Sequence, residues 1–396
     1  MEEEHRRHNL KEVLTELKDT IELMLDLAYS SILFDEKYFG GEVMELEDRV
    51  DDLINEAGGI IISAARGMAE TEDMVRLLRV LSIVDKMAEA ASDIAEIKLT
   101  GIGLPSHFLK SMNLLEETIA GVTIEDGMKA CGKSVSELEN ETKMVVLALK
   151  HEGRWSINPS GDRILLAGDR IIVKGPFDAL DDFEAYIYGR STIFPPEEEL
   201  NEPEEFRSIR ETIVEMKNYS ELAVDLAYSS MLFRDEGVSE EVGMLESRLD
   251  SLRKEIEEMV LRYAKRMEDP TPLAGVLHIA WSCERVSDAA LELAESSLRS
   301  ELLSALLSEA FEESEEILTR IEIPKGSRLE GKSMAELDLE GETGAQIIAI
   351  RKAGGKRWIY YPKGDIPIEA GDVLIIKGEK EFIEGFMKEL KVSKPL

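Results

Sequence analysis

One stretch of sequence occurs twice in this chain of 396 residues, and it limits the possible folds more than any other feature. Residues 26–34 read DLAYSSILF and residues 225–233 read DLAYSSMLF, so eight of nine letters match at an offset of 199. Two such copies indicate an internal duplication whose unit is about half the chain. We therefore expect two similar units, and the chain length suggests two to four domains in total.

The charge of the chain limits the kinds of partner. Its formal net charge is −35, and 33% of its residues are charged whereas 6% are aromatic. An acidic chain does not offer the cationic surface that nucleic acids and anionic membranes attract. The charge suits cation binding or contact with a basic partner, and a merely solvated acidic surface is an equal alternative. We expect no nucleic-acid partner.

The sequence also indicates a cellular location. Cys131 and Cys283 are too few and too far apart for a disulfide framework or a zinc knuckle. The N-terminal segment MEEEHRRHNLKEV lacks the apolar core of a signal peptide. No apolar run approaches the roughly 18 residues of a membrane-spanning helix. We expect a cytoplasmic protein without direct membrane insertion.

Each unit begins with a helical region. Apolar residues recur at helical spacing, and Gly40-Gly41 is expected to end the first helix. Small residues at Gly58-Gly59 are expected to let another helix approach closely. In the first unit this predicts helices at about 9–34, 42–68 and 71–99, with a fourth piece at 106–118. In the second unit the corresponding helices are at about 206–234, 238–267 and 272–298, with a fourth piece at 299–316.

Each unit ends in a small α+β domain, where the apolar pattern changes to short strands. The predicted strands are 144–149, 154–157 and 170–174, before a helix at 177–188, and in the second copy 345–351, 357–361 and 373–377. A proline-rich acidic linker joins the units. The predicted fold is a multidomain α+β chain in which all-α three-helix regions alternate with small α+β domains. The boundaries are 1–117, 118–190, 191–205 for the linker, 206–317 and 318–396.

The helical regions carry the spacing Glu-x-x-x-Asp three times each. A spacing of four residues places both carboxylates on one face of a helix. Packed helices can then gather oxygen ligands for hard or borderline cations. The alternative is ordinary solvated acid, because 82 of the 396 residues are acidic. The candidate metal ligands are Glu22, Asp26, Glu47, Asp51, Glu89 and Asp93, and in the second half Glu221, Asp225, Glu246, Asp250, Glu284 and Asp288.

Three-helix halves with these acidic pairs resemble the PhoU family of phosphate-signalling proteins. The resemblance covers about 1–100 and 206–300. It implies a helical bundle of two three-helix repeats, and some family members bind iron or zinc through such carboxylates. Iron, zinc or manganese is therefore the expected metal. The repeated stretch should lie at a packed helix face where the halves meet, with Tyr29, Leu33, Phe34, Tyr228, Leu232 and Phe233 as packing residues.

The α+β domains resemble the regulatory domain called RCK_C or TrkA_C of potassium-transport regulators. The second copy carries this resemblance in GKSMAEL at 331–337, QIIAIRK at 346–352, YYP at 360–362, GD at 371–372 and LIIKG at 374–378. The resemblance implies domains that pair, and some pairs bind cyclic di-AMP between subunits. Here the two copies could pair within one chain or in a homodimer. No Gly-x-Gly-x-x-Gly follows a strand, so NAD is not expected.

Basic residues near the hairpins are candidate contacts for an anionic ligand, because guanidinium and ammonium groups pair with phosphate oxygens. Solvated hairpin charges are the alternative. The candidates are His151, Arg154 and Arg163 in the first domain, and Arg351, Lys356 and Arg357 in the second.

Enzymatic interpretations find little support. The five histidines offer one Glu-x-x-His match, at Glu2 and His5, and no nucleophile elbow or phosphate-binding loop is present. The sequence predicts a non-catalytic regulator that senses a small ligand or metal and modulates potassium or other ion transport. Its partner would be a membrane transport protein or that protein's regulatory subunit. The alternatives are a regulator of phosphate-uptake signalling and a carboxylate-based metal-binding protein.

Overall fold

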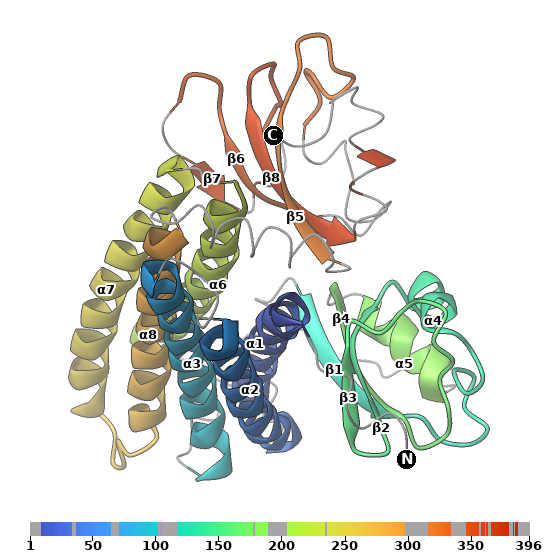
Figure 1. Cartoon of the computed structure of the whole chain (residues 1–396). Coiled ribbons are helices and arrows are strands. Elements are labelled where there is room, and N and C mark those ends of the chain that lie inside the picture. The colour runs from blue at the N-terminus through green and yellow to red at the C-terminus, as the bar shows by residue number, and fades with distance from the viewer. Residues whose placement is uncertain are drawn as a thin grey trace.

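The arrangement of the chain is taken from a computed structural model, shown in Figure 1. It describes residues 9–33, 37–64, 71–101, 104, 117–176, 179–188, 204–233, 236–297, 316–333, 346–355, 358–360, 362, 366–379, 383 and 385–386.

Three long helices form the first half, and their bounds are α1 (Leu10–Leu33), α2 (Lys37–Ala64) and α3 (Thr71–Leu99). A capping box begins α1, because the Asn9 side chain accepts from the Glu12 amide and the Glu12 side chain accepts from the Asn9 amide, both at 2.9 Å. Val13, Leu17 and Ile21 recur every four residues and are buried. This apolar stripe holds α1 against its neighbours, as the sequence predicted.

The glycines of α2 differ from the expectation. The helix α2 begins at Lys37, five residues before its predicted start, so Gly40 and Gly41 lie inside it and do not form a turn. A Cβ atom on Gly40 would approach Leu99 Cγ to 3.2 Å, so the missing side chain allows α3 to pack closely there. At Gly58 and Gly59 an added Cβ would meet nothing within 4 Å. The close approach predicted at that second pair is therefore wrong.

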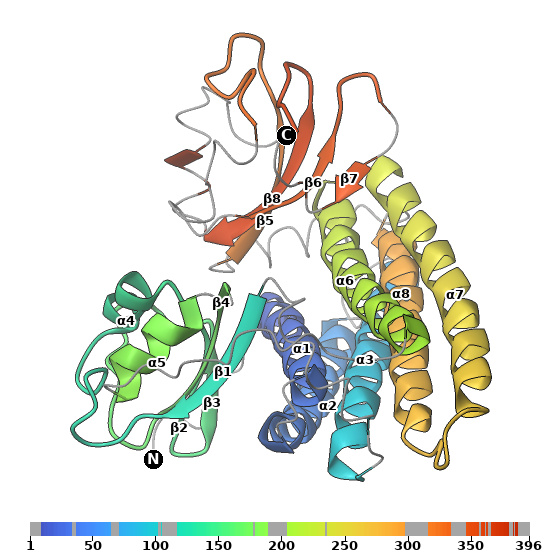
Figure 2. The same ribbon diagram turned by 180° about the vertical axis from the view of Figure 1, so that it is seen from behind.

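The second half repeats the pattern, with α6 (Glu204–Phe233), α7 (Glu236–Ala264) and α8 (Leu273–Ser297). The halves meet along α3 and α8, which lie side by side in Figures 1 and 2. Buried side chains from α1–α3 and α6–α8 belong to a single hydrophobic core. The expected six-helix bundle built from two halves is confirmed.

Each half is followed by a small antiparallel sheet. The first contains β1 (Glu117–Thr123), β2 (Val145–His151), β3 (Arg154–Ile157) and β4 (Arg170–Pro176), in the order β1-β4-β2-β3. The second contains β5 (Glu316–Glu322), β6 (Gln346–Arg351), β7 (Trp358–Tyr360) and β8 (Val373–Glu379), in the order β5-β8-β6-β7. Both sheets have a register shift at the same place, after Val146 and after Ile347.

The sequence prediction missed the first strand of each sheet. Residues 117–118 and 316, expected to end short helical pieces, belong to β1 and β5. The remainder of those predicted pieces lies outside the described residues. The first domain also contains α4 (Val135–Thr142), which Ser134 begins with a capping box, and α5 (Leu180–Tyr188).

Each sheet has two covered faces. In β4, Ile171 and Val173 belong to the domain's own core with α4 and α5, whereas Ile172 belongs to the core of the helical bundle. In β8, Leu374 faces the domain's own core and Ile375 the bundle. Side chains alternate along a strand, so Lys174 and Lys377 lie on the bundle side. Figures 1 and 2 accordingly show the helices on one side of the molecule, with the first sheet beside α1 and the second beside α6.

Within the described ranges, no helix combines the length and the apolar character needed to cross a membrane.

Candidate functional site

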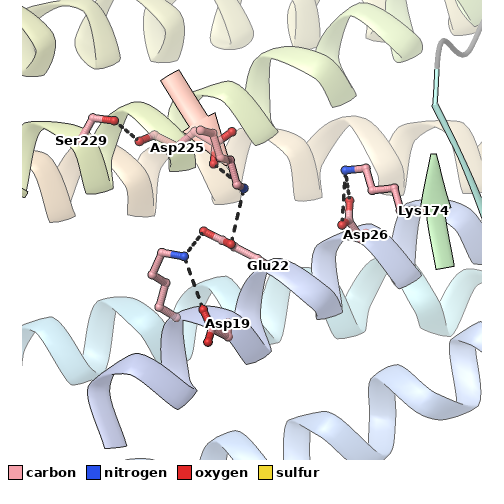
Figure 3. Close-up of polar contacts among 8 residues, drawn as sticks. Asp19, Glu22, Asp26, Lys174, Asp225 and Ser229 are labelled. Atoms are coloured by element: carbon pink, nitrogen blue, oxygen red, sulfur yellow. Dashed lines mark hydrogen bonds and ion pairs between the residues drawn. The ribbon is translucent and has the colours of Figure 1, made fainter. Parts of the chain in front are cut away.

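Four charged side chains meet where the two helical halves contact the second sheet. We call Lys18 and Glu22 of α1, Asp225 of α6 and Lys377 of β8 the central junction (Figure 3). Lys18 Nζ lies 2.9 Å from Glu22 Oε1. Lys377 Nζ lies 3.2 Å from Asp225 Oδ1 and 3.5 Å from Glu22 Oε2. One lysine of the second sheet therefore contacts carboxylates from both halves of the bundle.

The central junction is largely shielded from water, and its charges depend on one another. The side chains of Lys18, Glu22, Asp225 and Lys377 are 4%, 17%, 13% and 21% exposed. Burial alone would raise the pKa of Glu22, but the charges of Lys18 and Lys377 outweigh it and lower the pKa to about 2. Burial raises the pKa of Asp225 to about 6 despite Lys377, and Glu22 adds to the rise. Removing one charge would leave its partners buried without compensation.

The first sheet contacts the bundle through the equivalent lysine. Lys174 Nζ of β4 lies 3.3 Å from Asp26 Oδ1 of α1, as Figure 3 shows. A second lysine, Lys150 of β2, lies 2.8 Å from Glu42 and 2.6 Å from Glu45 of α2. These carboxylates all belong to the first half, so the first sheet is attached to its own half.

The repeated stretch lies where the halves meet. The Tyr29 hydroxyl is 2.6 Å from Ser220 Oγ of α6 and 3.4 Å from Cys283 Sγ of α8. Lys217 lies over the Tyr29 ring at 5.7 Å from its centre, and Lys18 lies over the Tyr228 ring at 5.6 Å. The predicted packing role of the two tyrosines between the halves is confirmed. The side chains of Leu33, Phe34, Leu232 and Phe233 lie outside the described residues.

The predicted metal ligands separate into two groups. The pairs of α1 and α6 face lysines, since Glu22, Asp26 and Asp225 bind the sheet lysines and Glu221 lies 2.7 Å from Lys217. The other pairs, which we call the outer carboxylates, lie on α2, α3, α7 and α8. Among the described residues, no three His, Cys, Asp or Glu side chains are arranged to hold a metal ion.

Arginines contact several of the outer carboxylates. Arg285 of α8 crosses to the first half, where it binds Asp93 and lies 3.2 Å from Glu89. Arg253 of α7 lies 3.0 Å from Asp250 and 3.4 Å from Glu284. These guanidinium groups occupy the neighbourhood in which a bound cation would lie.

Two of the outer carboxylates, Glu47 and Asp288, lie near other acids. Partial burial raises the pKa of Glu47, which also lies close to Ser92 and Asp51. Partial burial raises the pKa of Asp288 to about 6, and Glu284 and Glu246 add to the rise. The raised pKa values mean that the charged forms of Glu47 and Asp288 are less favourable in the folded protein than in water.

Replacing Asp288 by Asn should therefore stabilise the protein at neutral pH. The raised pKa means that the folded state holds a proton which the unfolded chain has released, so stability falls as the pH rises from about 4 to about 6. In D288N this loss disappears, and we expect melting about 1–2 °C above wild type near pH 7.5, with no gain near pH 4. Thermal unfolding in the presence of a metal chelator measures the melting temperatures of the two proteins. D93N is the control at the equivalent position: it loses the Arg285 pair and should gain nothing. An equal gain in both variants would contradict the assignment.

The predicted ligand contacts lie at different places in the sheet domains. His151 Nδ1 lies 2.5 Å from Oδ1 of the fully buried Asp169, so its ring is held by the Gly-Asp turn. Arg154 and Arg163 are exposed. Arg351 lies over the Trp358 ring, 5.0 Å from its centre. Lys356 and Arg357 lie outside the described residues.

Sequence reasoning missed Lys174 and Lys377. A signal was present, because each copy places a lysine before glycine at the end of the same apolar strand, IIVKG and LIIKG. Strand alternation puts that lysine on the face of Ile172 in the first copy and of Ile375 in the second. The signal becomes informative once that face is known to meet acidic helices.

The molecule is thus a duplicated helical bundle whose two sheet domains are joined to it by lysine–carboxylate pairs. The family comparisons identify the parts. The model of the TrkA-C domain matches residues 119–188 and 318–391, and the model of the PhoU domain matches residues 213–297. The chain therefore contains two regions that match the TrkA-C domain and, in its second helical half, one region that matches the PhoU domain. Both are regulatory families and not catalytic ones.

Solved structures show more distant similarity. PhoU from Pseudomonas aeruginosa is 11% identical, with 73% of this chain and 93% of that chain covered and a TM-score of 0.40. The RCK_C domain dimer of S. agalactiae BusR in complex with c-di-AMP is 24% identical, covering 18% and 97%, with a TM-score of 0.17. The GsuK channel bound to NAD is 14% identical, covering 70% and 53%, with a TM-score of 0.19.

Proposed function

We propose that this protein is a non-catalytic, cytoplasmic regulator of ion transport, with potassium as the favoured ion. The TrkA-C domains bind a small ligand, and the helical bundle passes the signal to a membrane transport protein or its regulatory subunit. One observation carries the proposal: an inner strand of each sheet presents a lysine to a carboxylate of the bundle, Lys174 to Asp26 and Lys377 to Asp225. A displacement of either sheet by a ligand would move a charge that is paired with a helix.

The favoured ligand is an anionic nucleotide such as cyclic di-AMP. The TrkA-C resemblance supports this choice, and so do the exposed guanidinium groups of Arg154 and Arg163, which suit phosphate oxygens. The two sheets are not hydrogen-bonded to each other in the described residues. A pair of TrkA-C domains would then form between two chains, which makes a homodimer part of the proposal.

Titration calorimetry tests whether the protein binds cyclic di-AMP. We expect saturable heat for the full chain, and an affinity about tenfold weaker for R154A and R163A, because each loses a charge-assisted hydrogen bond to phosphate. K129A is the control, since Lys129 is an exposed lysine of the same domain that lies over Tyr186. No heat at saturating nucleotide would reject this ligand, and equal affinity in all three variants would reject these contacts.

The PhoU match to residues 213–297 favours one second candidate, a regulator of phosphate-uptake signalling. Uptake measurements in cells that lack the protein distinguish the two. The ion-transport proposal predicts altered potassium uptake with phosphate uptake unchanged, and the reverse result supports phosphate signalling.

Metal binding by the outer carboxylates is a third proposal. Asp51 of α2 lies near Asp85 of α3, and partial burial together with the nearby Glu89 and Asp51 raises the pKa of Asp85. Such acids would bind a cation best where no arginine competes. In the first half this leaves Asp51 and Asp85, because Arg285 contacts Glu89, and in the second half Arg253 already contacts Asp250 and Glu284.

Metal analysis of protein purified without chelator tests this third proposal. Bound iron, zinc or manganese, or a higher melting temperature when one of them is added, is the expected result. Loss of that effect in D51N, with no loss in D250N, would assign it to the first half. No bound metal together with an unchanged melting temperature would remove the proposal.

A further inference from the structure

A tryptophan of α8 is held in one position at the surface of the bundle. Trp281 is 41% exposed, and its Nε1 donates to Glu257 Oε1 of α7 at 3.0 Å. Arg253 holds the same oxygen at 2.6 Å, and the His278 ring meets the indole edge-on at 5.5 Å between ring centres. A large side chain that is fixed before a partner arrives loses little entropy on binding, and tryptophan is enriched among the residues that dominate interfaces.

Apolar surface continues from Trp281 along the line where α7 and α8 meet. In Figures 1 and 2, α7 forms the edge of the bundle on the side away from the first sheet. The two helices are antiparallel neighbours, so Leu261, one turn beyond Glu257, lies opposite His278. Leu261 is 64% exposed. We call this line the α7–α8 seam, which is formed by Glu257, Leu261, His278, Trp281, Glu284 and Asp288.

The other end of the seam carries negative charge that no cation balances. Glu284 lies near Arg253, whereas Asp288 forms no ion pair within the described ranges and has Glu284 and Glu246 as acidic neighbours. The two helices as a whole are acidic, since α7 has eight acids and four bases and α8 has four acids and one base. The seam therefore suits an occupant that brings a positive charge to Asp288 and apolar surface to Trp281.

The spacing along α8 indicates the shape of that occupant. Trp281 and Asp288 are seven residues apart, which is about two helical turns and about 10 Å, so they lie on one face. A helix laid along the seam reaches both points with two of its own side chains, also seven residues apart. Amphipathic helices commonly bind in this way, through apolar side chains spaced by whole turns.

From this arrangement we propose that the α7–α8 seam is the docking surface for a basic amphipathic helix of a partner protein. The helix places an apolar side chain against Trp281 and Leu261, and a lysine or arginine seven residues away beside Asp288. The first half does not offer the same surface, because the exposed Lys86 stands where the repeat places Trp281. The seam rests on the proposed function for the identity of the partner, since it is where the bundle would meet the transport protein.

Titration calorimetry of the full chain with two synthetic peptides tests the seam, in a metal chelator and without nucleotide. Each peptide has about 18 residues, which is long enough to form a helix. One carries leucines on one face with lysines seven residues from them, and the other has glutamates in place of the lysines. We expect saturable binding of the lysine peptide that weakens as salt is added, and no binding of the glutamate peptide. Equal binding of the two peptides would overturn the proposal.

Surface variants then locate the binding of the lysine peptide. W281K, which introduces the residue of the first half, and L261A should each weaken it about tenfold, and D288N about threefold. I62A is the matched control for L261A, because Ile62 is the equivalent residue of the first half and is 62% exposed, and it should bind as wild type does.

Attraction of the lysine peptide to the acidic chain as a whole would give equal affinities in all four variants, and that result would overturn the proposal. If W281K does not fold, L261A and D288N decide the test, since both change exposed side chains. The assay measures neither nucleotide binding nor transport. Failure of the seam and failure of the proposed function are therefore separate results.

Discussion

Replacing Glu22 by Gln is expected to lower the free energy of unfolding by about 3 kcal/mol, because it leaves Lys18 and Lys377 buried without their shared anion. The effect should depend on pH. The pKa of Glu22 is lowered from its ordinary 4.5 to about 2, so its stabilising contribution is complete above about 4.5 and is lost as the pH falls through about 2. The difference between E22Q and wild type should therefore narrow in acid. Urea unfolding at several pH values measures it.

E221Q is the matched control for this variant. Glu221 occupies the equivalent position in α6 and pairs with Lys217 of its own helix at 2.7 Å, as Glu22 pairs with Lys18, but Glu22 also contacts Lys377 of the second sheet. A pair within one helix contributes about 0.5 kcal/mol. E221Q should therefore lose far less stability than E22Q. Equal losses in the two variants would show that the central junction has no special role.

Replacing Asp372 by Ala is the second change with a large expected effect. The Asp372 carboxylate is fully buried and accepts from the Ala353 amide, the Glu369 amide and Lys352 Nζ, at 2.8, 2.8 and 2.6 Å. Its removal leaves these donors without an acceptor, at a cost of about 3–5 kcal/mol. We expect the second sheet domain to unfold at a lower temperature than in wild type. Circular dichroism and hydrogen exchange of the β8 amides measure this unfolding.

Two further variants define what Asp372 does. D372N keeps the shape and one acceptor oxygen, so it should fall between wild type and D372A. E369A removes a side chain that is 63% exposed and should cost less than about 0.5 kcal/mol. If E369A and D372A destabilise the domain equally, the buried turn is not the cause.

The sequence allowed the repeat and the long helices to be predicted, because both depend on local patterns. Val13, Leu17 and Ile21 lie four residues apart, and this spacing is visible without any partner. The first strand of each sheet was missed for a physical reason. β1 and β5 pair with β4 and β8, and such pairing is decided by residues roughly fifty positions away in sequence.

The candidate site could be predicted only in part. The spacing of Glu22 and Asp26 correctly placed two carboxylates on one helix, but it could not show which element faces them. The same motif at Glu89 and Asp93 meets Arg285 from the opposite half. Identical spacings therefore acquire different partners through packing between halves, and no local pattern contains that information. Gly40 is a second example. The sequence pattern predicted a helix end there, whereas its missing side chain leaves room for Leu99 of α3, which local sequence could not show.

The most direct test of the proposed function is amide hydrogen exchange of α1 and α6 with and without saturating cyclic di-AMP. We expect binding together with changed exchange around Glu22 and Asp225, because the sheet lysines connect the proposed ligand-binding domains to the helices. In K377M the nucleotide should still bind, and the response of α1 to the second domain should be lost. Binding that leaves exchange in both helices unchanged would contradict the central claim that the TrkA-C domains signal through the bundle.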